Sequence, residues 1–259
     1  MSQVKPFIIY EQPLNERIRT FLRIESLFSQ FDYFSETEEQ WGIRSAINSL
    51  LDISDLVSRT DLKTELIKEL ERHSVTLKSL QQNPGVDPDR LNMVLNDISR
   101  YIDTLRNSNF QPGLTVKQDE LINSIKQRNA ILGGSCNFDL PAYHQWLHKP
   151  LEIQKESLHH WQRDLLTLKN STLLSLHLIR SSTNPTHECA VKGFYQKAIE
   201  PNVSCHLIRI IMPVTSVFYP EISAGKHRFT IRFMDQPSTS GRPVQTEDDV
   251  NFELHCCIL

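Results

Sequence analysis

The sequence predicts an α+β protein with a mostly helical domain and an antiparallel β-sheet domain. Apolar residues recur at helical spacing through most of residues 13–182. Beyond Asn184-Pro185 this spacing gives way to β-rich runs separated by Pro, Gly and Ser, and a short apolar run near the N-terminus supplies one further strand. Segregated helices and strands are typical of the α+β class. We therefore expect a helical domain at 13–182 and a sheet domain formed by 1–12 and 183–259.

Caps and apolar spacing predict about seven helices in the helical domain. Asn15 follows the break at Pro13 and can cap the first helix. Asp87-Pro88 places a cap and a proline in the order favoured at a helix start, after the break at Asn83-Pro84-Gly85. The other helical segments are expected at residues 41–57, 62–80, 121–125, 142–148 and 151–180.

Four segments are predicted to form the sheet: residues 7–10, 203–212, 227–235 and 250–257. The first of these is too apolar for a free tail, so we expect it to join the C-terminal strands. If the strands pair in one sheet, Arg209, Arg228, Arg232 and His255 gather on one polar face, with Glu253 as a partial counter-charge.

The alternation between residues 228 and 233 is unbroken and marks the candidate site. Successive strand side chains point to opposite faces, so Arg228 and Arg232 share one face with Thr230. The three apolar residues between them, two Phe and one Ile, share the other face. Two guanidinium groups on a rigid strand suit an acidic peptide or a phosphate backbone. The alternative is an ordinary solvated sheet surface in which these arginines pair with Glu253 or Asp235.

Composition limits the functional classes. Hydrophobic residues make up 39% and charged residues 23% of the chain, as in soluble globular proteins. A formal net charge of -3 disfavours a nucleic-acid coat, and no run approaches the roughly 18 apolar residues that cross a bilayer. Five cysteines without a CxxC pair and the lack of a leader segment favour a reducing cytoplasm.

No pattern in the sequence predicts an enzyme, a cofactor or a metal. His144 and His148 are one helical turn apart, as paired metal ligands are, but no HExxH motif joins them. Phosphate-binding loops and nucleophile motifs are also missing. Two alternatives stay open: an RNA-binding sheet, which is disfavoured because Phe229 and Phe233 lie opposite the arginine face, and a metal-dependent enzyme built on His187, Cys189 or Cys205.

Short motifs in a fixed order along almost the whole chain carry a resemblance to a known family. They are Pro13-Leu14-Asn15-Glu16-Arg17, Leu22-Arg23-Ile24-Glu25, Thr64-Glu65-Leu66-Ile67-Lys68-Glu69-Leu70, Pro84-Gly85-Val86-Asp87, Phe138-Asp139-Leu140-Pro141, Trp146-Leu147-His148, Gly193-Phe194-Tyr195-Gln196, Tyr219-Pro220 with Ile222-Ser223, Arg228-Phe229 with Ile231-Arg232-Phe233-Met234, and Phe252-Glu253-Leu254. With these motifs the chain resembles the ZapD (YacF) family of Z-ring-associated cell division proteins.

The resemblance implies a cytoplasmic, dimeric, two-domain adaptor at the midcell division ring. Family members bind the C-terminal tail of FtsZ, the tubulin-like division GTPase, through a basic pocket and cross-link its filaments; no cofactor, nucleic acid or membrane insertion is involved. Arg228 and Arg232 match the family's basic strand residues. The further pocket residues that we expect are His144, Arg59, Arg209 and Lys226. The chain departs from some relatives at Glu120, where a basic residue is expected.

Overall fold

Two compact units make up the chain. The computed structural model describes residues 6–199, 204–225 and 227–258. The helical unit comprises Thr20–Ser175; the sheet unit combines Met1–Arg19 with Leu176–Leu259. The boundaries between the units fall inside helices α1 (Glu16–Ser35) and α9 (Leu166–Arg180). The α+β prediction, with N-terminal helices and antiparallel strands from both ends of the chain, is confirmed.

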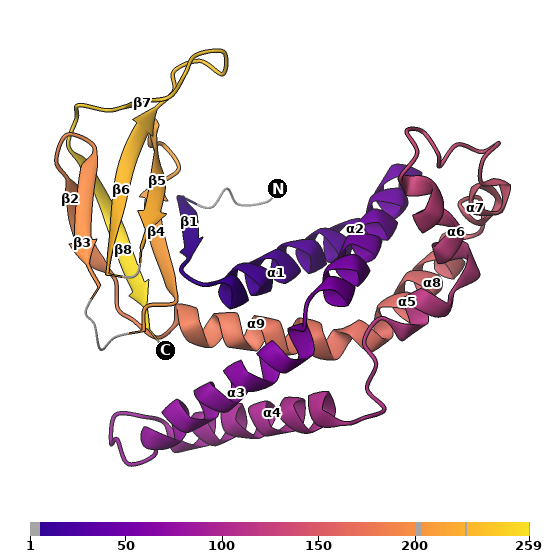
Figure 1. The fold of residues 1–259 in the computed structure, drawn as a ribbon, viewed down its shortest axis with the longest axis horizontal. Coiled ribbons are helices and arrows are strands. Elements are labelled where there is room, and N and C mark those ends of the chain that lie inside the picture. The colour runs from indigo at the N-terminus through magenta and orange to yellow at the C-terminus, as the bar shows by residue number, and fades with distance from the viewer. Residues whose placement is uncertain (1–5, 200–203, 226, 259) are drawn as a thin grey trace. The chain divides into compact units, whose positions relative to one another are not determined.

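Helices follow one another from α1 to α9 (Figure 1). Between α1 and α9 lie α2 (Gln40–Arg59), α3 (Leu62–Ser79), α4 (Pro88–Arg106), α5 (Leu114–Gln118), α6 (Glu120–Asn129), α7 (Pro141–Trp146), α8 (Leu151–Gln162) and the 3-10 turn η1 (Arg163–Leu165). The expected long helix at 151–180 is therefore divided by η1, and α5 was not predicted.

Side-chain caps fix where several helices begin. Asn15 Oδ1 accepts a hydrogen bond from the Ile18 amide at 2.9 Å, as its position predicted. Asp87 Oδ1 accepts from the amides of Asp89 and Arg90 at 3.0 and 3.2 Å, with Pro88 in the first turn. These contacts satisfy amide groups that have no partner inside the helix.

Strands of the sheet unit form two sheets. In the first sheet the order is β1 (Phe7–Pro13), β4 (Leu207–Pro213), β8 (Val250–Cys257) and β2 (Thr186–Ala190). In the second sheet it is β3 (Phe194–Ala198), β6 (Arg228–Asp235) and β5 (Phe218–Ala224), and β7 (Val244–Gln245) pairs with β6. All of these pairings are antiparallel.

The two sheets pack face to face as a β-sandwich (Figure 1). One apolar cluster joins Ile208, Ile210 and Phe252 of the first sheet to Phe229 and Ile231 of the second. The expectation of one sheet is therefore wrong. Strand alternation had shown that each strand buries one face, and in the folded unit it is the opposite sheet that covers that face.

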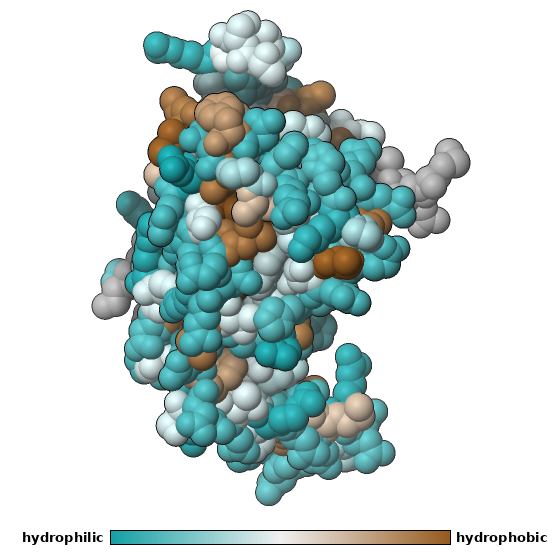
Figure 2. Space-filling model, turned by 90° about the vertical axis from the view of Figure 1, so that its right-hand side faces the viewer, coloured by the Kyte–Doolittle hydropathy of each residue, from teal (hydrophilic) through white to brown (hydrophobic). Residues whose placement is uncertain are grey.

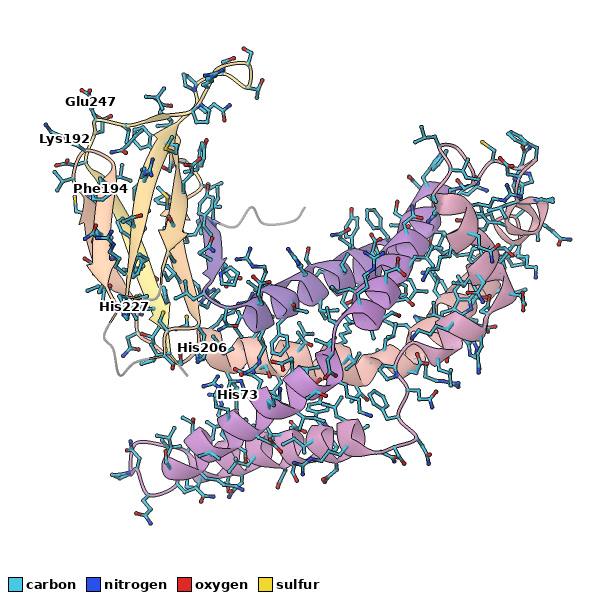
Figure 3. The ribbon with its side chains drawn as sticks, in the orientation of Figure 1. His73, Lys192, Phe194, His206, His227 and Glu247 are labelled. Atoms are coloured by element: carbon cyan, nitrogen blue, oxygen red, sulfur yellow. The ribbon has the colours of Figure 1, made fainter. Side chains whose placement is uncertain are left out.

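A tight turn carries the chain from the first sheet to the second. Lys192 and Gly193 both have positive φ, 49° and 67°, as the two central residues of a type I′ hairpin turn do. A Cβ atom at Gly193 would lie 2.6 Å from the Thr246 carbonyl oxygen, so only glycine fits without a shift of the backbone. Figure 3 shows Lys192 in this turn, Phe194 just after it, and Glu247 at the same end of the sandwich.

Candidate functional site

Strand β6 presents its two arginines to solvent, as its alternation predicted. Arg228 and Arg232 are exposed, whereas Phe229, Ile231 and Phe233 are buried between the sheets. The two arginines are four positions apart in the strand, which places their Cα atoms about 13 Å apart at roughly 3.3 Å of rise per residue. The buried Phe and Ile side chains anchor the strand, so the arginine stems start from a rigid base.

Neighbouring strands complete the outer face of the second sheet. Arg232 lies directly between Phe194 of β3 and Glu221 of β5, and Arg228 lies opposite Ala198. Residues directly opposite in an antiparallel pair point to the same side of the sheet. Tyr219 of β5 lies opposite Met234 and shares this face. The face therefore combines two arginines, one acidic side chain and two aromatic rings: Tyr219, which is half-buried, and Phe194, which is 42% exposed.

The two guanidinium groups are available to a ligand. Within the part of the chain that the structure describes, neither Arg228 nor Arg232 forms an ion pair, although Glu221 lies across from Arg232 in the strand register. Exposed ion pairs contribute only ~0–1 kcal/mol, so Glu221 would compete weakly with a ligand carboxylate.

Arg209 lies in the other sheet and has an acidic partner. Its Nε donates to Glu11 Oε1 at 2.8 Å, and the same carboxylate accepts from Arg180 Nε and Nη2 at 2.8 and 2.7 Å. The Arg209 side chain is only 15% exposed. His255, across from Arg209 on β8, pairs with Glu253 at 2.8 Å.

The expectation that Arg209 and His255 share one face with Arg228 and Arg232 is wrong. The first pair belongs to the outer face of the first sheet and the second pair to the outer face of the second sheet. Since the sandwich buries the two inner faces against each other, its outer faces point in opposite directions. Glu253 likewise balances His255 rather than an arginine.

His144 lines a cavity of about 720 Å³ in the helical unit. Its ring lies 4.4 Å from that of His148, centroid to centroid, and Lys149 and the exposed Phe138 complete one side. Hydrophilic residues dominate the molecular face seen in Figure 2, with hydrophobic residues surfacing in patches among them. Because Lys149 and Phe138 both line it, the cavity offers cationic and apolar contacts.

Arg59 lines a second cavity of the helical unit, of about 480 Å³. Arg23 contributes another guanidinium there, but Asp52 and Asp55 contribute carboxylates. Arg59 Nη2 lies 3.8 Å from Asp55 Oδ2, and burial together with the nearby Asp55 raises the pKa of Asp52. This cavity therefore has mixed charge. Lys226, the last expected pocket residue, lies outside the described residues.

Sequence reasoning missed the two residues that flank Arg232. Phe194 and Glu221 belong to β3 and β5, which were not predicted as strands. The sequence of β3, Phe-Tyr-Gln-Lys-Ala, does not alternate apolar and polar residues, and Pro220 in the middle of β5 argues against a strand by composition alone.

The described residues give no support to a metal site or a membrane span. No three His, Cys, Asp or Glu side chains in 6–199, 204–225 and 227–258 converge to hold an ion. Across those same ranges, none of the helices has both the length and the apolarity that a bilayer-spanning helix needs.

Comparisons with known proteins agree with one another. The family model described as "Cell division protein", ZapD, matches residues 22–232. The chain is 38% identical to the cell division protein ZapD of Methylococcus capsulatus over 256 residues, which cover 99% of this chain and 100% of that protein. It is 36% identical to ZapD of Ralstonia pickettii over 251 residues (96% of this chain, 99% of the relative). Identity to ZapD of Nitrosomonas eutropha is 37% over 252 residues, covering 97% and 100%.

Proposed function

The chain belongs to the ZapD family of cell division proteins, and we propose that it binds the C-terminal tail of FtsZ through the arginine face of the second sheet. A role in cell division follows from the family. The observation that carries the finer proposal is the pair Arg228 and Arg232, exposed on β6 without an ion-pair partner among the described residues. An adaptor of this kind needs no catalytic group and no cofactor.

The chemistry of the face selects an acidic and partly apolar peptide. Arginine binds carboxylates in a bidentate fork, and the exposed ring of Phe194 beside Arg232 can cover an apolar side chain of the same peptide. A tail that is disordered when free must be ordered on binding, so we expect micromolar affinity for a single site. Binding should also weaken as salt rises, because the contacts are exposed.

Cross-linking requires two sites in one particle. We propose that the protein is a homodimer in the cytoplasm at the midcell division ring, where each protomer holds a tail from a different FtsZ filament. Many tails along each polymer then raise the effective concentration and convert weak single contacts into stable bundling.

His144, Arg59 and Lys226 are further candidates for contacts with the tail. His144 is supported by its cationic and apolar cavity, whereas Arg59 shares its cavity with two carboxylates. Arg209 has a different role in this proposal: its ion pair with Glu11 stabilises the sandwich.

The test combines direct binding of an FtsZ tail peptide with co-pelleting of FtsZ polymers. Arg228→Glu with Arg232→Glu should lower tail affinity at least tenfold, since two contacts of ~1 kcal/mol each become repulsive, and should abolish bundling. The matched control is Lys192→Glu with Arg242→Glu, which reverses two exposed charges elsewhere in the same unit. Equal affinity of the two double variants would remove the arginine face from the mechanism.

RNA binding is the second candidate, because Phe194 places one exposed aromatic ring on the arginine face. RNA-binding sheets usually stack two or three bases on such rings, and the net charge of -3 disfavours a polyanion. A mobility-shift assay with single-stranded RNA at physiological salt distinguishes RNA binding from FtsZ-tail binding. A shifted RNA band, together with no binding of the FtsZ tail peptide, would favour RNA.

A further inference from the structure

Two cysteines meet at one end of the sandwich, where β4 begins and β8 ends. Cys256 lies across from Ile208 in the strand register, and the His206 amide donates to the Cys257 carbonyl at 2.8 Å. Cys205, next to His206, therefore lies beside the end of β8; Figure 3 shows His206 at this end of the unit. Both cysteines are half-buried and pack against the apolar cluster between the sheets.

The two thiols interact from neighbouring chain ends. The Cys205 thiol donates a hydrogen bond to the Leu207 carbonyl oxygen at 3.7 Å, and its interaction with the Cys256 thiol is the largest influence on its pKa. A disulfide requires Cβ atoms about 3.5–4.5 Å apart and a sulfur–sulfur bond of about 2.05 Å. Both cysteines pack against the same apolar cluster at the start of β4 and the end of β8, so a local movement of these two chain ends would bring the sulfurs to that geometry.

Charged groups on β2 and β3 surround Cys256. Lys197 of β3 lies close enough to act on the thiol, and its Nζ is 3.4 Å from Glu188 Oε1 of β2. The neighbouring Cys205 thiol lowers the pKa of Cys256 most; burial raises it, Lys197 lowers it and Glu188 raises it, and together they lower the pKa of Cys256 to about 7. Tyr195, on β3, interacts with Glu188 and stays protonated, since burial and that carboxylate raise its pKa. Near neutral pH, Cys256 is therefore partly a thiolate.

Cys205 takes the complementary role. The neighbouring Cys256 thiol and burial raise the pKa of the Cys205 thiol. One sulfur of the pair is therefore poised as a nucleophile while the other keeps its proton. A thiolate next to a resolving thiol is the arrangement found in redox-sensitive cysteine pairs.

We propose that Cys205 and Cys256 form a modification site at which hydrogen peroxide oxidises the pair to a disulfide. The Cys256 thiolate attacks one peroxide oxygen; the S–O bond forms, the O–O bond breaks, and hydroxide leaves. Cys205 sulfur then attacks the sulfenic sulfur, so that the S–S bond forms and the S–O bond breaks. The departing hydroxide takes the Cys205 proton. In total the two thiols lose two electrons and two protons, and the peroxide is reduced to two waters. This inference is independent of tail binding.

The other three cysteines lack this arrangement. Cys136 and Cys189 are exposed, and neither has a thiol partner among the described residues. Cys257 is fully buried on the opposite side of β8, and burial raises its pKa to about 11. These residues therefore serve as internal references for reactivity.

Limited treatment of the full chain with hydrogen peroxide tests the proposal. Free thiols should fall from five to three, the intact mass should fall by about 2 Da, and unreduced digests should contain the Cys205–Cys256 linked peptides. In Cys205→Ser, Cys256 should instead accumulate as a sulfenic acid that dimedone traps. Cys189→Ser is the matched control and should leave the linkage unchanged.

The rate of Cys256 oxidation, measured in variants that keep both cysteines, distinguishes a reactive thiolate from two thiols that merely lie close together. Lys197→Gln should slow oxidation of Cys256 several-fold and Glu188→Gln should speed it, because the two charges shift the thiolate fraction in opposite directions. Hydrogen exchange of β8 amides verifies that each variant is folded. If the linked peptide does not form, or if Cys256 oxidises no faster than Cys136 and Cys189, the proposal is overturned.

Discussion

Glu11 joins two arginines on the outer face of the first sheet, and Glu11→Gln removes the charge that joins them. The carboxylate accepts three hydrogen bonds, two from Arg180 and one from Arg209, all between 2.7 and 2.8 Å. The three side chains are 18%, 22% and 15% exposed, respectively. They are therefore well shielded from water, in contrast to most ion pairs of a protein surface.

The expected loss of stability in Glu11→Gln follows from this geometry. Removing one partner of a fully buried ion pair costs ~3–5 kcal/mol, and a charge-assisted hydrogen bond contributes ~1.5–3 kcal/mol. Gln keeps one oxygen acceptor of the same reach, and residual exposure lets water compensate in part. We therefore expect Glu11→Gln to lower the free energy of unfolding of the sheet unit by about 2–3 kcal/mol.

The assay must report on the sheet unit alone. Trp41, Trp146 and Trp161 all lie in the helical unit, so indole fluorescence follows that unit only. Hydrogen exchange of β1 and β4 amides during urea unfolding gives the local value instead. The control is Glu221→Gln, an exposed carboxylate of the same unit, with an expected change below about 0.5 kcal/mol. Equal losses in both variants would refute the structural role of Glu11.

Three further predictions concern local features. Gly193→Ala should destabilise the sandwich by about 1–3 kcal/mol, because φ is 67° and the new Cβ would meet the Thr246 carbonyl; exchange of β3 amides reports it. Burial raises the pKa of Tyr143 to about 12. Between pH 10 and 12 the Tyr143 phenol therefore ionises in the unfolded chain but not in the folded chain, and the free energy of unfolding falls by about 2 kcal/mol as the pH rises. Unfolding followed by tryptophan fluorescence should show this loss in the wild-type chain, and the Tyr143→Phe variant should lack it. Asp87→Ala removes the cap of α4 and should cost about 1 kcal/mol in thermal unfolding.

Helix starts were the most predictable part of the fold. Caps such as Asn15 and Asp87 act on amides two or three residues away, so their effect is visible in a short stretch of sequence. Helix α5 has only five residues, too few for an apolar period to show. The turn η1 interrupts a continuous apolar stripe without any Pro or Gly, which left no local signal for the break.

Strands were predictable only where their alternation was clean. Strand β6 places apolar residues inward at every second position, and it was predicted within one residue. Strands β2 and β3 instead contribute Glu188 and Lys197 to a polar cluster near Cys256, which blurs their alternation. Alternation also says which residues of one strand share a face, but not whether another sheet or a helix covers that face. For this reason, the division of the strands into two sheets could not be predicted from the sequence.

The role of each strand arginine depends on its cross-strand neighbour and on water. Arg209 and Arg232 each lie opposite a glutamate, Glu11 and Glu221, and by sequence the two pairs look alike. The first pair closes at 2.8 Å in a shielded site, where the carboxylate also holds Arg180. The second pair is exposed, and no ion pair forms between its described side chains. In water such a pair would contribute only ~0–1 kcal/mol, so Glu221 competes weakly with an incoming carboxylate, whereas displacing Glu11 would lower the stability of the sandwich. The proposal therefore assigns tail binding to Arg232, whose acidic neighbour Glu221 holds it weakly, and not to Arg209.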